Sequence, residues 1–577
     1  MDNGSIAQVL GEIADLLEIK GENAFKIRAY RSAADTVATT GDAVARMNDA
    51  QLRGIPGIGK DLAARIRELV DTGASTYHRT LLDEFPPTML ELLRLQGVGP
   101  KTVARLHATL GVASLDDLAA AARAGRIRTM PGMGAKKEAQ ILKAVEDRQR
   151  DQGRHQLADT AAVCDELLGH LRAGHPAAEF TAVGSLRRGR ETCGDIDILC
   201  IGGDGEAVMA AFVAHPRVER VLGQGDTKSS VQLRGGYQAD LRRVEPESRG
   251  AAMQYFTGSK AHNIELRDRA LQRGYRLNEY GLFKLDDASR LAGDTEEGIY
   301  AALGLRWVEP ELREHRGELQ ASEQHTLPAL VTRADLRGDL HMHTTESDGR
   351  EPLEVMAAAA HRLGYEYIAI TDHSKSLAMA NGLDERRALE HAARVRALNG
   401  RFEGLTLLAG IECDILADGS LDLADDCLAQ LDIVVASIHS HFSQEESQMT
   451  DRVLRALDCR WVDVLGPPTG RRLLQREGLR LRLDDVIGHA VSRGVALEIN
   501  SQIERLDLND SHIRLALDKG ATLVVSSDSH FVSALEWVEW GIRMARRGWA
   551  TPGHILNTRS LAELRPLLRR HRHRGAA

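Results

Sequence analysis

Apolar residues follow helical spacing at the start of the chain and strand spacing towards its end. Ile6, Leu10, Ile13 and Leu17 stand three or four positions apart, which predicts an amphipathic helix. Glycines interrupt this pattern up to about residue 150, so we expect a region of short helices. From about residue 336, short apolar strands alternate with helical segments, which predicts an α/β fold.

Between these regions, a strand at 180–183 leads into residues 184–199, which combine a Gly-Ser turn, paired arginines and two aspartates. Because strands have period two, Asp195 and Asp197 point to the same face. Two carboxylates this close are unfavourable without positive charge, and a divalent cation is the usual solution. Gly-Asp-x-Asp alone is more often a turn into an edge strand. The preceding Gly184-Ser185, whose backbone N–H groups could hold phosphate, favours a site for metal and triphosphate.

Length and composition limit the class of protein. A chain of 577 residues is too long for one core, so we expect three or four domains. It has no apolar run long enough to cross a membrane and no signal-peptide pattern at its start. Six cysteines without CxxC spacing indicate a reducing compartment, so we expect a cytoplasmic protein. A net charge of −9 argues against a protein that coats DNA in bulk.

Three short turns with paired glycines, at 55–60, 95–101 and 130–136, each precede a helical pattern. Such glycines allow close backbone approach, and the N–H groups that begin the next helix can bind a DNA phosphate. One turn would more often be a helix cap, and the third could lie at a domain edge. Together they resemble helix-hairpin-helix modules, which bind DNA without sequence preference. The DNA-binding candidates are Gly57, Gly59, Gly97, Gly99 and Lys101.

The string from Gly184-Ser185 through Arg187-Arg188-Gly189 to Asp195 and Asp197 resembles the palm of family X DNA polymerases. The resemblance implies a third catalytic carboxylate on a neighbouring strand, for which Asp240 in segment 238–242 is the best candidate. A lone strand aspartate would otherwise be a surface residue. Asp195, Asp197 and Asp240 would then hold two divalent ions, Mg²⁺ or Mn²⁺, for nucleotidyl transfer.

The same family resemblance implies a nucleotide site. Tyr255 and Phe256 would line the incoming sugar, and Asn263 would contact its base. Two aromatic residues before a glycine could instead be ordinary core. The nucleotide-binding candidates are Gly184, Ser185, Arg188, Gly194, Tyr255, Phe256, Gly258 and Asn263, and Arg267 joins the DNA-binding set.

One departure concerns lyase chemistry. Relatives with deoxyribose-phosphate lyase activity carry a Schiff-base lysine in the helix after the first hairpin, and that position here is Arg65. A guanidinium stays protonated and cannot act as the amine nucleophile. We therefore expect lyase activity to be weak or absent.

Beyond residue 336, nearly every predicted strand ends in a residue that can bind a metal. A lone histidine at a strand end is usually structural, but repetition around a domain is how (β/α) barrels build active sites. The order of these residues resembles the polymerase and histidinol phosphatase (PHP) family of metal phosphoesterases, which implies two or three Zn²⁺ or Mn²⁺ ions. The metal-binding candidates are His341, His343, Asp348, His373, Glu412, His439, Asp528 and His530.

Pro467 departs from the PHP pattern, because relatives have a metal-binding histidine at this position. We expect His341, His343, Glu412 and Asp528 to hold one ion, and Asp348, His373 and His530 another. An ion that shares Glu412 and His439 loses a ligand, so we expect weaker metal occupancy and reduced nuclease activity. His441 could compensate.

We therefore expect a multidomain chain: helical hairpin regions at 1–85 and 86–153, an α+β nucleotidyltransferase palm at 154–245, a thumb-like subdomain at 246–312, a linker at 313–335, and a distorted (β/α)7-type PHP barrel at 336–577. The favoured function is gap-filling repair synthesis on primed or gapped DNA with dNTPs, by a monomer whose barrel trims 3′ ends. One alternative makes end processing by the barrel the main activity. Another is a non-catalytic DNA-binding scaffold, against which the complete carboxylate set argues.

Overall fold

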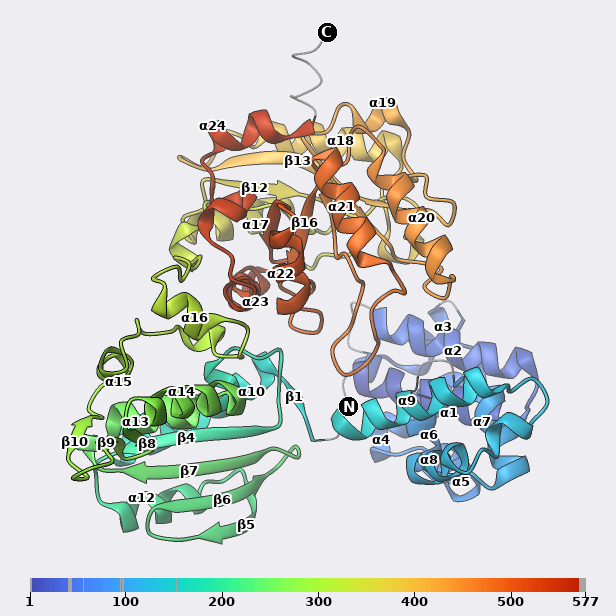
Figure 1. The fold of residues 1–577 in the computed structure, drawn as a ribbon. Helices are drawn as coiled ribbons and strands as arrows, with labels where there is room; N and C mark the ends of the chain where they lie inside the picture. Colours follow the sequence, from blue (N-terminus) through green and yellow to red (C-terminus); the bar gives the residue numbers. More distant parts are fainter. Residues whose placement is uncertain are drawn as a thin grey trace. The chain divides into compact units, whose positions relative to one another are not determined.

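The computed structural model in Figure 1 describes residues 3–39, 44–55, 57–93, 95, 98–151 and 153–569. The chain divides into two compact units, Met1–Gln152 and Gly153–Ala577, and each is described by itself. Within the described ranges, none of the helices has the length and apolar character needed to span a membrane.

The first unit is helical, as the hydrophobic pattern predicts. Its helices are α1 (Asn3–Lys20), α2 (Ala24–Thr39), α3 (Asp49–Gly54), α4 (Lys60–Thr72), α5 (Thr76–Glu84), α6 (Thr88–Leu92), α7 (Pro100–Leu110), α8 (Leu115–Arg123) and α9 (Ala135–Asp151). Two of the predicted glycine turns end at helix starts, because Gly59 is the N-cap of α4 and Gly99 that of α7. Neither cap has a side chain to satisfy the first N–H groups, so a ligand can reach N–H groups at both helix starts, although in α7 Pro100 has no N–H and Thr102 N already donates to the Gly99 carbonyl.

The second unit begins with a five-stranded sheet in the order β2-β4-β7-β6-β5. Its elements are β1 (His155–Gln156), α10 (Leu157–Gly174), β2 (Glu179–Ala182), α11 (Gly184–Arg187), β3 (Thr192–Cys193), β4 (Asp195–Ile201), α12 (Gly205–Val213), β5 (Val218–Gln224), β6 (Lys228–Leu233) and β7 (Gln238–Val244). Ile196 and Ile198 are buried in the same core as residues of α10 and α12. The alternate positions of β4 therefore face away from these helices.

A small helical and β subdomain follows the sheet. It comprises α13 (Arg249–Thr257), α14 (Lys260–Gln272), β8 (Tyr275–Asn278), β9 (Gly281–Lys284), β10 (Arg290–Ala292) and α15 (Glu296–Ala302), with the strands in an antiparallel sheet of order β10-β9-β8. The segment 313–335, predicted as a linker, is folded and contains α16 (Glu318–Glu323). Arg313 is fully buried and donates a hydrogen bond to Glu296 over 2.7 Å. Tertiary charge pairing thus orders a stretch whose charged composition alone suggests exposure.

The C-terminal part is a nearly closed barrel of seven parallel strands in sequence order. Its strands are β11 (Gly338–Asp339), β12 (Tyr367–Ile370), β13 (Thr406–Asp414), β14 (Ile433–Ser437), β15 (Val464–Leu465), β16 (Ala496–Asn500) and β17 (Leu523–Ser526). Its helices are α17 (Leu353–Arg362), α18 (Glu385–Ala397), α19 (Asp425–Leu428), α20 (Glu446–Leu457), α21 (Leu483–Arg493), α22 (Asp510–Asp518), α23 (Val538–Arg547) and α24 (Leu561–Leu564), and α18, α20 and α21 lie around the outside in Figure 1. A single bridge between Met342 and Ser529 joins the first strand region to the last.

The sequence predicts one strand through 339–343 with His341 and His343 on the same face, but β11 is shorter, because regular pairing stops at Asp339, before both histidines. The Met342 bridge nevertheless continues the alternation, so His341 and His343 flank a residue that points the other way. All the strand ends that carry predicted ligands lie at the carboxyl end of the barrel, as expected for parallel strands.

Candidate active sites

Three aspartates come together on one face of the five-stranded sheet. Strands β4 and β7 are parallel neighbours, and their register sets Asp197 beside Asp240 and Asp195 beside Gln238. The turn before α11 approaches this group closely, because a Cβ at Gly184 would lie 2.1 Å from the Asp197 carboxylate. Only glycine fits there, so the Gly-Ser turn and the carboxylates form one site.

This group of aspartates has excess negative charge. Burial first, and then the neighbouring Asp195 and Asp240, raise the pKa of Asp197 to about 7. Lys228 offsets part of this charge, since its Nζ lies 2.8 Å from Asp240 Oδ2. Carboxylate oxygens crowded on one face are the ligands that Mg²⁺ and Mn²⁺ prefer, so the residues present fit a divalent ion.

The Gly-Ser turn also presents one buried hydroxyl that lacks a partner in the described part of the chain. Ser185 Oγ is buried and has no hydrogen-bond partner among the described residues.

The two arginines that follow differ in their environment. Arg187 forms a two-pronged pair with Glu296, with N–O distances of 2.9 and 2.6 Å, so it supports the fold. Arg188 donates to Glu314 over 3.1 Å and to the Thr257 carbonyl, at the edge of the carboxylate face.

The two aromatic residues predicted to line the sugar of the nucleotide lie at the end of α13. The Tyr255 and Phe256 rings meet edge to face, with centroids 5.1 Å apart. Gly258 has φ of +70°, and a Cβ there would lie 3.1 Å from Arg188 Nη1, so glycine permits the approach of this arginine. The Asn263 amide is used internally, because it donates to the Tyr255 carbonyl and accepts from Gln254, both over 2.7 Å. Contact with a base would require these bonds to change.

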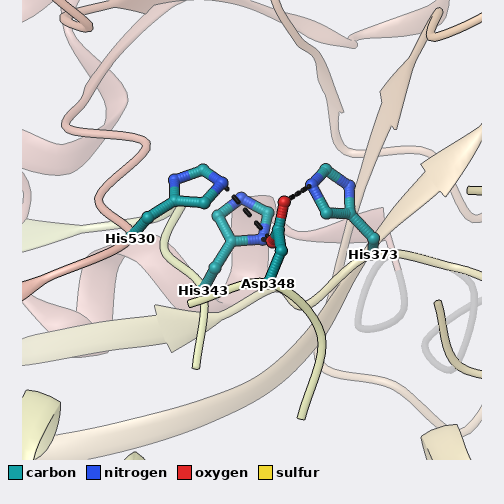
Figure 2. Close-up of side chains that lie close together, drawn as sticks. All are labelled: His343, Asp348, His373 and His530. Carbon is teal, nitrogen blue, oxygen red and sulfur yellow. Dashed lines mark ion pairs between the residues drawn. The ribbon is translucent and has the colours of Figure 1, made fainter. Parts of the chain in front are cut away.

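Four side chains converge at the open end of the barrel (Figure 2). His343, Asp348, His373 and His530 offer ligand atoms within 4.8 Å of one another. The carboxylate of Asp348 is central, at 3.4 Å from His373 Nε2 and 3.5 Å from His530 Nε2. Their elements are far apart in sequence but adjacent at this end of the barrel, so the fold assembles the cluster.

Two further clusters share members with the first. His341 and His343 meet Asp528, whose Oδ1 lies 3.0 Å from His343 Nε2. His373, Glu412 and His439 form the other, with Glu412 Oε2 at 2.7 Å from His373 Nδ1. His343 and His373 therefore each belong to two clusters. The structure brings all eight predicted barrel ligands together, and the sharing of His343 and His373 differs from the predicted assignment, in which Glu412 is the shared ligand.

The chemistry of the barrel cluster fits metal ions. Four buried ligand atoms, His341 Nε2, His343 Nδ1, His373 Nδ1 and Glu412 Oε2, make no hydrogen bond of good geometry among the described residues, although His373 Nδ1 and Glu412 Oε2 lie 2.7 Å apart. Burial alone would lower the pKa of His341, but Glu498, Asp528 and Glu412 hold this pKa well above its ordinary value. Burial, with His530 and His373 nearby, lowers the pKa of His343 to about 4. Histidine nitrogens together with carboxylate oxygens are ligands for Zn²⁺ or Mn²⁺.

Comparison with protein families divides the chain in the same order. Models described as a helix-hairpin-helix domain and a SAM-like helix-hairpin-helix tandem match residues 1–75 and 89–147. DNA polymerase beta palm and thumb models match residues 155–231 and 252–314, and a PHP domain model matches residues 339–502.

A relative from Bacillus subtilis (strain 168), named DNA polymerase/3′-5′ exonuclease PolX, is 36% identical over 573 residues. The match covers 99% of this chain and 100% of that protein. This chain belongs to the family X DNA polymerases. DNA polymerase lambda of Rattus norvegicus is 28% identical over 45% of the chain and 48% of its own length. A probable phosphatase of Shewanella sp. (strain MR-4) is 29% identical over 34% of the chain and 77% of its own length.

The family assignment confirms the predicted architecture of helical hairpins, palm, thumb and PHP barrel. The individual site residues remain predictions. Among the DNA-binding candidates, Gly97 lies outside the described residues. Arg267 is exposed on α14 and donates to the Asn263 carbonyl over 3.3 Å. Arg65, at the predicted lysine position, lies over the Tyr77 ring at 5.0 Å.

Sequence reasoning missed several residues of both sites. Asp414 Oδ1 lies 3.3 Å from His439 Nδ1, and its position two residues after Glu412 on β13 was a signal that could have found it. Glu498, which the sequence places at the end of a predicted strand although it is not in the predicted ligand set, lies 2.7 Å from His341 Nδ1, where it can orient this ring. Lys228 and Glu314 carry no local signal, because their roles depend on partners brought near by the fold.

Proposed function

We propose that this chain is a DNA-directed DNA polymerase that fills short gaps during repair, and that its PHP barrel removes nucleotides from 3′ ends. The observation that carries the polymerase assignment is the set of three carboxylates at adjacent strand positions beside the Gly184 turn. The printed name of the Bacillus subtilis relative, which this chain matches over nearly its whole length, supports the pairing of both activities.

At the palm, Asp195, Asp197 and Asp240 would hold Mg²⁺ or Mn²⁺, and at the barrel the clustered histidines and carboxylates would hold Zn²⁺ or Mn²⁺. When bound, such ions supply Lewis-acid activation of the attacking oxygen and neutralise charge on the reacting phosphate. The difference in donor atoms supports different metals at the two sites, all oxygen in the palm and mixed nitrogen and oxygen in the barrel.

The remaining palm and thumb residues would bind and orient substrate. The Ser185 hydroxyl and the Arg188 guanidinium would hold triphosphate oxygens. Gly184 and Gly194 would leave room for the protein backbone to approach the triphosphate. Tyr255 and Phe256 would line the sugar of a dNTP, Gly258 would allow the turn beside it, and Asn263 would read the base edge. The orphaned Ser185 hydroxyl supports this assignment, since it needs a polar partner.

The helical unit would hold the DNA. N–H groups without a side-chain cap at the start of α4, after Gly57-x-Gly59, and in the first turn of α7, which contains Lys101, support phosphate binding. On the thumb, Arg267 would contact the template strand. We keep the predicted domain limits 1–85, 86–153, 154–245, 246–312, 313–335 and 336–577, and a monomeric chain, as part of the proposal.

A second candidate function makes hydrolysis by the barrel the main activity. The match to a probable phosphatase over 207 residues supports it. Pro467 argues for a weakened barrel, because a proline side chain offers no ligand atom. It follows β15, the strand beside the one that leads to His439.

Replacing Pro467 with histidine is expected to raise the metal content by about one ion per chain and to speed 3′ digestion several-fold. The new imidazole would complete the set formed by His373, Glu412 and His439. Elemental analysis of purified protein measures the content. Pro468→His is the matched control, since Pro468 lies in the same turn after β15 and the PHP family pattern assigns no ligand to its position. Three tightly held ions in the parent chain would contradict the role given to Pro467.

The proposed function is tested by giving the full chain a duplex with a one-nucleotide gap. With Mg²⁺ or Mn²⁺ and the complementary dNTP, we expect one-nucleotide extension of the primer. Without dNTP, we expect slow shortening from the 3′ end. Chelation with EDTA is expected to abolish both, because both sites depend on divalent ions. Shortening without extension under every metal tested would favour the hydrolase function.

A further inference from the structure

Two arginines of helix α23 in the barrel reach the phosphate-binding turn of the palm. Arg547 Nη1 donates to the main-chain carbonyl of Arg188 over 2.7 Å, across 359 positions of sequence. One turn earlier on the helix, Arg543 packs on Gly189, where an added Cβ would lie 3.4 Å from the arginine Cβ. Gly189 has φ of +65°, a backbone conformation that favours glycine, and an added Cβ would be in van der Waals contact with the Arg543 side chain.

The contact extends to the charge of Arg188. Glu314 Oε1 accepts from Arg188 Nε over 3.1 Å and from Arg547 Nη1 over 3.0 Å. Arg190 adds a weaker contact to the other oxygen at 3.6 Å. Burial alone would raise the pKa of Glu314, but Arg547, Arg188 and Arg190 hold it below its ordinary value. Glu314 is therefore shared between an arginine assigned to the nucleotide and an arginine of the barrel.

Arg547 is itself held rigidly. Its side chain is 2% exposed, and its second amino group donates to Asp510 at the start of α22 over 2.6 Å. Asp510 also lies 3.2 Å from Arg316. A guanidinium whose two terminal nitrogens are both hydrogen-bonded has little freedom to move. The positions of α22 and α23 therefore fix where Arg547 holds the Arg188 carbonyl and Glu314.

We propose that Arg547 is a positioning residue for the polymerase reaction, through which the PHP barrel sets the affinity of the palm for the triphosphate of a dNTP. It acts in two ways. Its bond to the Arg188 carbonyl fixes the turn that carries Ser185 and Arg188. Its hydrogen bond to Glu314 means that this carboxylate is shared between two guanidinium groups and neutralises less of the charge of Arg188. Arg188 therefore keeps more positive charge with which to bind phosphate. The inference rests on the proposed function of the palm.

The test measures gap filling by the full-length chain as a function of dNTP concentration. Arg547→Ala is expected to raise KM for dNTP about tenfold, with kcat within about threefold, because the catalytic carboxylates are untouched. Arg547→Lys should recover part of the loss, since one ammonium can reach the carbonyl without the fork. The rate of 3′ digestion should stay within about twofold of the parental rate. Arg547 donates hydrogen bonds to Arg188, Glu314 and Asp510, and none of these residues is a barrel ligand candidate.

The matched control is Arg546→Ala. Arg546 is the adjacent residue of α23 and pairs with Glu311 over 2.7 Å and with Glu309 over 3.3 Å, without touching the phosphate turn. It removes a comparable ion pair from the same boundary, so KM for dNTP should be unchanged. Hydrogen–deuterium exchange gives a second readout, in which uptake at residues 184–190 should rise for Arg547→Ala alone.

Arg547→Met keeps the aliphatic volume if the alanine variant fails to fold. A folded Arg547→Met or Arg547→Ala variant with parental KM and parental exchange at 184–190 would overturn the inference. So would equal losses of extension and 3′ digestion in the Arg546 and Arg547 variants, which would indicate a purely structural role. If the parent chain extends no primer, the proposed function fails, and the exchange measurement still decides whether Arg547 holds the turn.

Discussion

Replacing Asp240 with alanine is expected to lower gap filling about a thousandfold, or about 4 kcal/mol of transition-state stabilisation. Asp240 stands directly beside Asp197 in the register of β4 and β7, and it is the carboxylate closest to a cation, Lys228. Removing it takes away one of three oxygen ligands and leaves Lys228 to compete with the metal. The measurement is single-turnover extension on a gapped duplex, at saturating dNTP and Mg²⁺.

The control for Asp240→Ala is Asp226→Ala, which removes an exposed carboxylate from the loop between β5 and β6 of the same sheet. It should extend the primer at the parental rate. Asp240→Asn keeps the side-chain size and should be as inactive as alanine, since the amide is a poor metal ligand. Digestion of 3′ ends should persist in all three variants. Extension that survives Asp240→Ala would refute the assignment of the catalytic carboxylates.

Features that depend on short-range pattern could be predicted from the sequence. The alternation of Asp195 and Asp197 with isoleucines fixes their face wherever the strand lies. Parallel strands bring their carboxyl ends to one edge, so a ligand at each strand end predicts a cluster before any contact is known. Glycine turns before helices are local in the same sense, and those at Gly59 and Gly99 begin helices as expected.

Features that depend on long charged side chains could not be predicted. Arg187 and Arg188 are adjacent, yet one pairs with Glu296 and the other with Glu314, more than a hundred positions away. Composition suggested an exposed linker at 313–335, whereas the fold buries Arg313 against Glu296. Sequence reports the charge of a residue but not its partner, because flexible stems reach whatever the tertiary fold brings near.

The division of metals in the barrel has the same limit. Sequence order groups His341 with His343 and separates both from Asp348, His373 and His530. The structure places His343 in contact with both groups, with its Nε2 at 3.0 Å from Asp528 and its Nδ1 at 3.8 Å from Asp348. A ring with two nitrogen atoms can face two clusters at once, and only the geometry shows which histidine does so.

His343 is therefore the barrel residue whose loss should have the largest effect. His343→Ala is expected to lower 3′ digestion about a thousandfold, because two of the three ligand clusters lose a member. Primer extension should stay within about twofold, since the palm carboxylates lie on another sheet. The measurement is loss of the 3′ nucleotide from a primed duplex without dNTP, together with bound metal counted per chain.

A buried histidine also fills space, so the effect of lost ligation must be separated from that of a cavity. His343→Gln keeps most of the volume, and it should lose metal and digestion as the alanine variant does, while melting closer to the parent. His489→Ala, which removes an α21 histidine paired with Asp458 over 2.9 Å, should digest 3′ ends at the parental rate. Digestion that survives His343→Gln but disappears in Asp240→Ala would assign the nuclease to the palm. Because the two sites lie on separate sheets, the paired variants decide between them without removing either domain.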